Sequence, residues 1–145
     1  MFVVDTNVLI YAADRDAPEH APCRALLEGW RRQAGAWYLT WGIVYEFLRV
    51  TTHPGVFHAP WTPAQAWTFV EAVLASPALR VLAPTSRHPE LLGRLIREVP
   101  RVTGNLFHDA HTAVLMQEHG VRAIYTRDTD FHRFPFLEVI DPLAA

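Results

Sequence analysis

The first ten residues, Met1–Ile10, read MFVVDTNVLI and decide the fold that we expect for the chain. A short apolar run ends at Asp5, Thr6 and Asn7 interrupt it, and apolar residues then resume. This pattern predicts a strand that passes directly into a helix, with Thr6 or Asn7 as the cap of the helix. Asp5 would then lie at the carboxyl end of the strand, which is the edge where open α/β sheets bind ligands.

Helical and strand patterns alternate along the rest of the chain, with few signals for hairpins. The predicted further strands are 37–39, 80–82, 122–126 and 137–140, and the predicted helices lie near 23–30, 43–52, 63–77, 91–99 and 106–119. Thr40 and Thr62 are predicted helix caps, and Gly120 is predicted to end the last helix. This order is typical of an α/β fold with a parallel sheet covered by helices.

The composition indicates one globular domain. The chain has 145 residues, of which 50% are hydrophobic and 19% charged, and its formal net charge is -2. These values exclude a disordered tail and argue against a uniformly basic nucleic-acid coat. The single cysteine, Cys23, excludes an internal disulfide. The N-terminus shows no leader pattern and no apolar run approaches membrane-spanning length, so we expect a soluble, cytoplasmic protein without a membrane partner.

Five carboxylates lie at positions where they are candidates for a functional site. Asp5 follows a strand, Glu46 lies in the apolar helix WGIVYEFLRV, and Asp109 opens the helix FHDAHTAVLM. Asp128 and Asp130 lie in TRDTDF, directly after a strand. A free carboxylate in an apolar helix is expensive, and acidic groups that converge on one edge repel unless a cation lies between them. Hard cations such as Mg²⁺ or Mn²⁺ choose such oxygen sites.

Each of these acids also has a purely structural interpretation. Asp5 can cap a helix, Glu46 can pair with an arginine one turn on, and Asp109 can favour a helix N-terminus. Asp128 and Asp130 can form a turn. Their joint occurrence in this order is what favours a metal site.

The histidines offer a different hypothesis, a zinc hydrolase. His108 and His111 are three residues apart on one predicted helix, and His132 follows the TRDTDF segment. This spacing permits zinc binding, but no HExxH-type pattern accompanies it. Solvent-facing histidines are the simpler interpretation.

At this point a family resemblance becomes visible. VVDTNVLI at the start, Glu46 in mid-chain, the FHDA helix start and TRDTDF near the end resemble the PIN-domain ribonucleases and, among them, the VapC toxins of toxin–antitoxin pairs. The resemblance implies a single PIN domain over residues 1–145. It also implies a Rossmann-like, three-layer α/β/α sandwich with a mainly parallel sheet and an acidic pocket that binds Mg²⁺ or Mn²⁺.

The same resemblance assigns roles to individual residues. Asp5, Glu46, Asp109 and Asp128 match the acidic quartet of the family, and Asp130 is a plausible fifth carboxylate. One ion would lie at Asp5 and Asp109, with a second near Glu46 and Asp128.

Residues around the acids receive supporting roles. Thr126 matches a supporting hydroxyl residue, and Asn7 would orient the first aspartate. Arg49, Arg127 and Arg133 are candidates for holding flanking phosphates of a nucleic acid.

The implied function is that of a metal-dependent endoribonuclease, the toxin of a VapBC-type pair, with an RNA substrate. A VapB-like antitoxin and a homodimer are the implied partners. Two alternatives stay open: a housekeeping PIN nuclease of RNA processing, and a non-enzymatic PIN-like binding module. The aromatic loop from His53 to Pro63 has no counterpart in the shared pattern.

Overall fold

The centre of the protein is a five-stranded sheet, described here in a computed structural model for residues 1–144. The strands are β1 (Phe2–Val4), β2 (Trp37–Thr40), β3 (Leu79–Leu82), β4 (Ala123–Tyr125) and β5 (Glu138–Ile140). Their order is β3-β2-β1-β4-β5, and every neighbouring pair is parallel. Ala145, the last residue of the predicted domain, lies outside the described residues.

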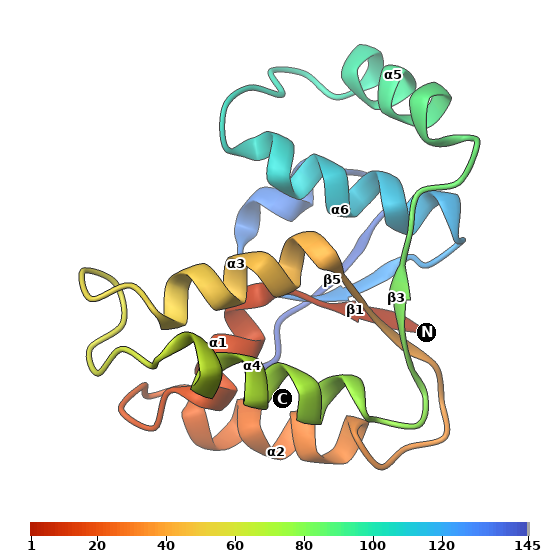
Figure 1. Ribbon diagram of the computed structural model, residues 1–145. Coiled ribbons are helices and arrows are strands. Elements are labelled where there is room, and N and C mark those ends of the chain that lie inside the picture. Colours follow the sequence, from red (N-terminus) through yellow and green to blue (C-terminus); the bar gives the residue numbers. More distant parts are fainter. Residues whose placement is uncertain (145) are drawn as a thin grey trace.

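Helices cover both faces of this sheet (Figure 1). They are α1 (Thr6–Ala13), α2 (His20–Trp30), α3 (Trp41–Thr51), α4 (Pro63–Leu74), α5 (His88–Glu98) and α6 (Leu106–Glu118). α5 and α6 lie on one side, α1, α2 and α4 lie on the other, and α3 runs between α6 and α1 (Figure 1). The predicted three-layer α/β/α sandwich with a parallel sheet is therefore confirmed.

Local capping follows the sequence closely in α3, α4 and α6. The Thr40 side chain accepts a hydrogen bond from the Ile43 N–H at 3.1 Å. Thr62 and Gln65 form a reciprocal capping box at the start of α4. Gly120 has a φ of 68°, the left-handed conformation that commonly ends a helix. These three predicted helix boundaries are confirmed.

Two details of the sequence-based prediction are wrong. The cap of α1 is Asp5, as in its purely structural interpretation, rather than Thr6 or Asn7, because the Thr6 N–H donates to the Asp5 carboxylate at 2.8 Å. Residues 127–135, where we predicted neither a helix nor a strand, contain a 3-10 helix, η1 (Thr129–Arg133), which the Asp128 side chain caps. In both cases an aspartate of the candidate site also shapes the backbone next to it.

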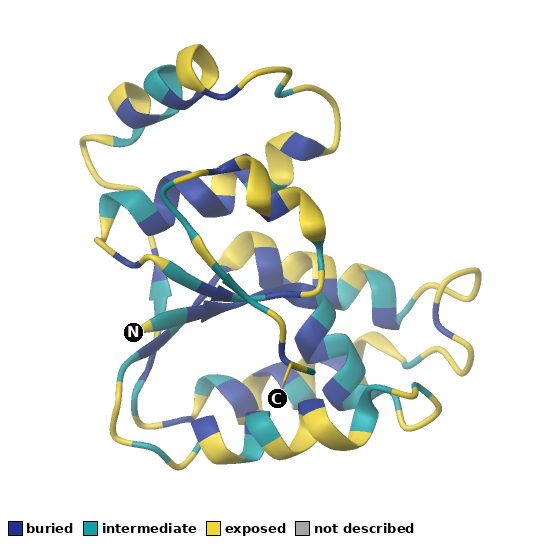
Figure 2. Cartoon of the chain, turned by 180° about the vertical axis from the view of Figure 1, so that it is seen from behind, coloured by how far each residue is buried: buried dark blue, intermediate teal, exposed yellow. Residues whose placement is uncertain are grey.

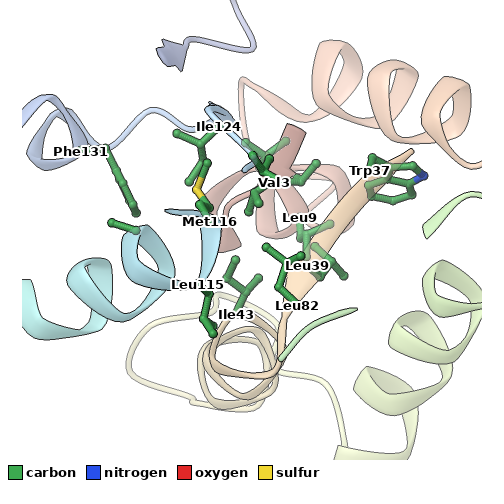
Figure 3. Packing of buried hydrophobic residues seen from close by; sticks show 14 of the residues in the cluster. Val3, Leu9, Trp37, Leu39, Ile43, Leu82, Leu115, Met116, Ile124 and Phe131 are labelled. Carbon is green, nitrogen blue, oxygen red and sulfur yellow. The ribbon is translucent and has the colours of Figure 1, made fainter. Parts of the chain in front are cut away.

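The hydrophobic core fills the space between the sheet and its helices. Figure 3 shows Val3, Leu39 and Ile124 of the sheet facing helix residues such as Leu115 and Met116, all of them essentially inaccessible to solvent. Seen from behind, the central strands are largely buried, and the helices are buried toward the sheet and exposed outward (Figure 2). Within residues 1–144, no helix combines the length and the apolar character needed to cross a bilayer.

The aromatic loop between α3 and α4 is anchored to those two helices. Phe57 is only 6% exposed, and its ring centroid lies 5.8 Å from that of Trp61. The Trp61 ring in turn contacts Phe47 of α3 and Phe69 of α4, with ring centroids 6.2 and 5.7 Å apart. Such tilted aromatic pairs stabilise a fold beyond their buried area. The aromatic residues of this loop therefore hold it against the α3–α4 pair.

Candidate functional site

The candidate site begins at Asp5, which lies where β1 ends and α1 begins. Its carboxylate is 7% exposed and accepts hydrogen bonds from the Thr6 N–H, the Thr126 hydroxyl and the Asn7 amide, at 2.8, 2.7 and 3.1 Å. A buried carboxylate requires such donors. The predicted orienting contact from Asn7 is confirmed, and so is a supporting contact from Thr126.

Thr126 links the ends of the two central strands. Its hydroxyl donates to Asp5 and accepts from the Asn7 amide at 2.9 Å and from the Asp128 N–H at 3.0 Å. The Asp5 N–H also donates to the Tyr125 carbonyl at 3.0 Å, which continues the pairing of β1 with β4. One buried hydroxyl thus fixes both Asp5 and the backbone that carries Asp128.

A second group of carboxylates joins the start of α6 to the start of η1. Asp109, Asp128 and Asp130 can each place one carboxylate oxygen within 4.8 Å of the other two. Asp109 and Asp128 are half-buried and Asp130 is exposed. Asp128 also accepts the Asp130 N–H at 2.9 Å, so one of its oxygens is committed to the cap of η1. The structure therefore brings both aspartates of TRDTDF to the same place as Asp109.

Glu46 reaches the site from α3, but it is not buried as we expected from its apolar helix. Its side chain is 47% exposed, because it projects from the side of α3 that faces away from the core. The Thr6 hydroxyl donates to it at 3.2 Å, and Arg49 lies 4.0 Å away. Sequence reasoning missed Thr6, although its place beside Asp5 at the start of α1 is the signal that could have identified it.

Three of these acids, Asp5, Glu46 and Asp109, line a cavity of about 440 Å³ between α3 and α6. Asp5 and Asp109 lie in its wall, and α3 contributes Tyr45, Glu46 and Arg49. From α6 come His108, His111 and Thr112. This volume lies within the ~300–1,000 Å³ range of small-molecule sites.

The arginines do not all lie where we expected them. Arg127 forms ion pairs of 3.5 and 3.4 Å with Glu19 and Asp141, and Arg133 donates to two backbone carbonyls between α5 and α6. Both guanidinium groups have these partners and neither lines the cavity, so their role in holding phosphate stays a prediction. Arg49 does lie in the cavity wall, as predicted.

The electrostatics of the site disfavour several negative charges at once. Burial, with smaller contributions from Glu46 and Asp128, raises the pKa of Asp5 to about 6 despite its hydrogen bonds. Burial and the charges of Asp128, Asp5, Asp130 and Glu46 raise the pKa of Asp109 to about 7. Among residues 1–144, no ion pair reaches Asp5, Asp109, Asp128 or Asp130. The site thus lacks positive charge of its own where the acids meet.

The potential metal ligands that lie together here are all carboxylate oxygens, which suits a hard divalent cation. The structure gives less support to the hypothesis of a histidine-bound zinc. His108 and His111 lie in the cavity wall, but within the described part of the chain no cluster of three potential ligands contains a histidine. The donor chemistry therefore fits Mg²⁺ or Mn²⁺ rather than a histidine-bound zinc.

We expect the metal-free protein to lose stability as the pH rises from about 4 to 8. The folded state favours protonated Asp5 and Asp109, so their stabilising contribution is complete below pH 3.8 and is lost as the pH passes about 6 and 7. For Asp5 a shift of about two pKa units corresponds to about 3 kcal/mol. Urea unfolding in EDTA across this pH range measures the free energy of unfolding.

Two comparisons make this prediction specific to the site. Asp5→Asn should lack the part of the pH dependence that Asp5 contributes, because the amide carries no charge at any pH in this range, and should keep the part contributed by Asp109. Mg²⁺ at pH 8 should restore the stability of the unmodified protein, since a bound cation replaces the protons. A free energy of unfolding in EDTA that stays level or rises from pH 4 to 8 in both proteins would contradict the crowding of these carboxylates.

Comparison with known proteins places this architecture. The sequence model of the PIN domain family matches residues 2–137. Ribonuclease VapC48 of Mycobacterium tuberculosis is 33% identical over 141 residues, covering 97% of this chain and 96% of the relative. Ribonuclease VapC37 of the same organism is 37% identical, covering 92% of each chain. A chain in the crystal structure of VapBC2 from Rickettsia felis superposes with a TM-score of 0.69 and 15% identity, over 96% of each chain.

Proposed function

The chain belongs to the PIN-domain family, alongside VapC ribonucleases that are 33% and 37% identical to it, and from this premise we propose that it is a metal-dependent endoribonuclease. We propose further that it is the toxin of a VapBC-type toxin–antitoxin pair and that residues 1–145 form a single PIN domain. The observation that carries the proposal is the meeting of Asp109, Asp128 and Asp130 beside the buried Asp5.

Five residues would hold the cation. They are Asp5, Glu46, Asp109, Asp128 and Asp130, and Asp109 is central because it belongs both to the carboxylate cluster and to the cavity wall. When bound, Mg²⁺ or Mn²⁺ supplies Lewis-acid polarisation of the phosphate and a lower pKa for water. The raised pKa values of Asp5 and Asp109 support this assignment, because a cation relieves the cost of ionising them together.

The other residues of the site position the reacting groups. Thr126 and Asn7 hold the carboxylate of Asp5, and Thr6 connects Asp5 to Glu46. Such supporting contacts fix the orientation of metal ligands. Arg49, which is 64% exposed at the cavity wall, is placed to contact a phosphate next to the one that is cleaved. The proposed products are a 5′-phosphate and a 3′-hydroxyl.

We propose a VapB-like antitoxin and a second copy of this chain as protein partners. Solved structures that share the fold include VapBC complexes from Rickettsia felis and nontypeable Haemophilus influenzae, the second with a TM-score of 0.67. An acidic cavity that lacks a cation is complementary to a basic side chain, which is a route by which an antitoxin segment could close it.

Cleavage of a panel of end-labelled structured RNAs tests the proposed activity. We expect discrete cuts with Mg²⁺ or Mn²⁺, none in EDTA, and a loss of cleavage in Asp5→Asn. Asp16→Asn, which removes an exposed carboxylate outside the cavity, is the matched control and should cleave normally. Cleavage with Zn²⁺ alone would move the chemistry to His108 and His111. Folded, antitoxin-free protein that cleaves nothing would favour the binding-module alternative.

A further inference from the structure

One aromatic side chain of the cavity wall is unusually exposed. Tyr45 of α3 is 70% exposed, yet it lines the same cavity as Asp5 and Asp109. Trp41 lies one turn earlier on the same helix and is 48% exposed. Single exposed aromatics are common, but two on successive turns beside a functional cavity mark a surface that meets a partner.

The rest of this helix face carries groups that suit a nucleotide. Tyr45 and Arg49 are four residues apart, which is about 6 Å along a helix, and both line the cavity. Arg49 forms only a long 4.0 Å ion pair with Glu46 and is 64% exposed. A nucleotide carries its phosphate and its base on opposite sides of one ribose. A ring next to phosphate-binding groups therefore faces the base.

We propose that Tyr45 stacks on an unpaired nucleobase next to the scissile phosphate, with Trp41 and Arg49 extending the same face of α3 along the RNA strand. This inference rests on the proposed ribonuclease function and adds the residue that selects for an unpaired nucleotide at the cut. A base inside a duplex is already stacked on its neighbours, so its face is unavailable to the ring. Unpaired bases, by contrast, commonly stack on aromatic side chains.

Two observations favour RNA over a protein as the partner of Tyr45: the ring lies in the cavity of the candidate site, and a positive charge lies nearby. The ring shares its cavity with Asp5, Glu46 and Asp109, three of the carboxylates that would hold the cation, so a bound phosphate brings the adjacent base to Tyr45. Arg49 adds positive charge on the next turn, which complements the RNA backbone.

The test compares side chains and bases at the same contact. Tyr45→Phe keeps the ring, Tyr45→Leu keeps apolar bulk without a ring, and Tyr45→Ala removes both. We expect the KM for a short cleavable RNA to rise roughly 10- to 100-fold in the Leu and Ala variants and to change little in Phe, the range given by base–aromatic stacking. Trp67→Ala on α4, which is 41% exposed outside the cavity, is the matched control and should behave as unmodified protein.

Two further RNAs complete the test, each with an abasic residue on one side of the mapped cut. If the ring stacks on the base, removing the base on the contacting side abolishes the difference between unmodified protein and Tyr45→Ala. Equal effects of Tyr45→Ala on normal RNA and on both abasic RNAs would overturn the proposal. An unchanged KM combined with lost dimerisation or lost antitoxin binding would also overturn it, because Tyr45 would then belong to a protein interface.

A binding measurement separates this inference from the proposed activity. Fluorescence anisotropy of the same RNAs is measured with Asp5→Asn, which we expect not to cut them. If the unmodified protein cleaves no RNA, but RNA binding still requires both the Tyr45 ring and the base, the ribonuclease function is wrong and the nucleobase contact stands. Cleavage that proceeds equally well with Tyr45→Ala would remove the contact and leave the function.

Discussion

Asp109→Asn is expected to abolish cleavage while making the metal-free protein more stable. The variant removes one carboxylate from the cluster with Asp128 and Asp130, so cation binding and the several kcal/mol of catalysis that the cation provides are lost, about 10³-fold or more in kcat/KM. The same change removes a charge whose burial, together with repulsion from the neighbouring acids, raises the pKa of Asp109 to about 7. Discounted for its partial exposure, this should add about 1–2 kcal/mol to the free energy of unfolding at pH 8 in EDTA.

Cleavage assays and urea unfolding on the same preparation measure both effects. Mg²⁺ should stabilise the unmodified protein and leave Asp109→Asn unaffected. Asp16→Asn again provides the control, since it removes an exposed carboxylate without touching the cluster. If Asp109→Asn lost activity and became less stable in EDTA, Asp109 would be holding the fold together rather than holding a cation.

Thr126→Val should weaken metal binding without removing any carboxylate. The hydroxyl is 1% exposed, donates to Asp5, and accepts from Asn7 and the Asp128 N–H. Its loss removes one of the three donors to Asp5 and leaves the Asp128 N–H without its partner, which costs about 1–3 kcal/mol of stability. Because supporting contacts typically change metal affinity or activity by about 10- to 100-fold, the Mg²⁺ concentration for half-maximal cleavage should rise by a similar factor.

Two variants show whether this effect belongs to the site. Thr126→Ser retains the hydroxyl and should restore most of the metal affinity. Thr51→Val removes another buried hydroxyl, which donates to the Phe47 carbonyl at 2.8 Å in α3, and should lower stability without shifting the Mg²⁺ dependence. An unshifted Mg²⁺ dependence in Thr126→Val would show that Asp5 does not need this donor.

The fold and the meeting of the carboxylates could be predicted from the sequence, because both depend mainly on the parallel topology of the sheet. An aspartate directly after an apolar strand must lie at the carboxyl edge of the sheet, and β1 and β4 are neighbours. Asp5 and Asp128 therefore come to the same edge. The place of Asp109 at the site could be predicted because this residue lies at the start of α6, the helix that precedes β4.

Side-chain contacts were harder to predict because they depend on distances that the sequence does not encode. Arg127 and Arg133 are close to Asp128 in sequence, but nearer acceptors engage them. Glu46 was expected to be buried because apolar residues surround it in sequence. Tyr45 on the preceding position shares its exposure, since both occupy the outward side of α3.

The hydrogen bond between Thr126 and Asp5 joins residues 121 positions apart, and this separation matters while the protein is being synthesised. A nascent chain emerges from the ribosome with Asp5 first, but β4 and the Thr126–Asp130 segment are added only after α6. At about 5–20 residues per second, this interval is about 6–24 s. A growing chain therefore carries no assembled site, and any product truncated before residue 126 lacks one permanently.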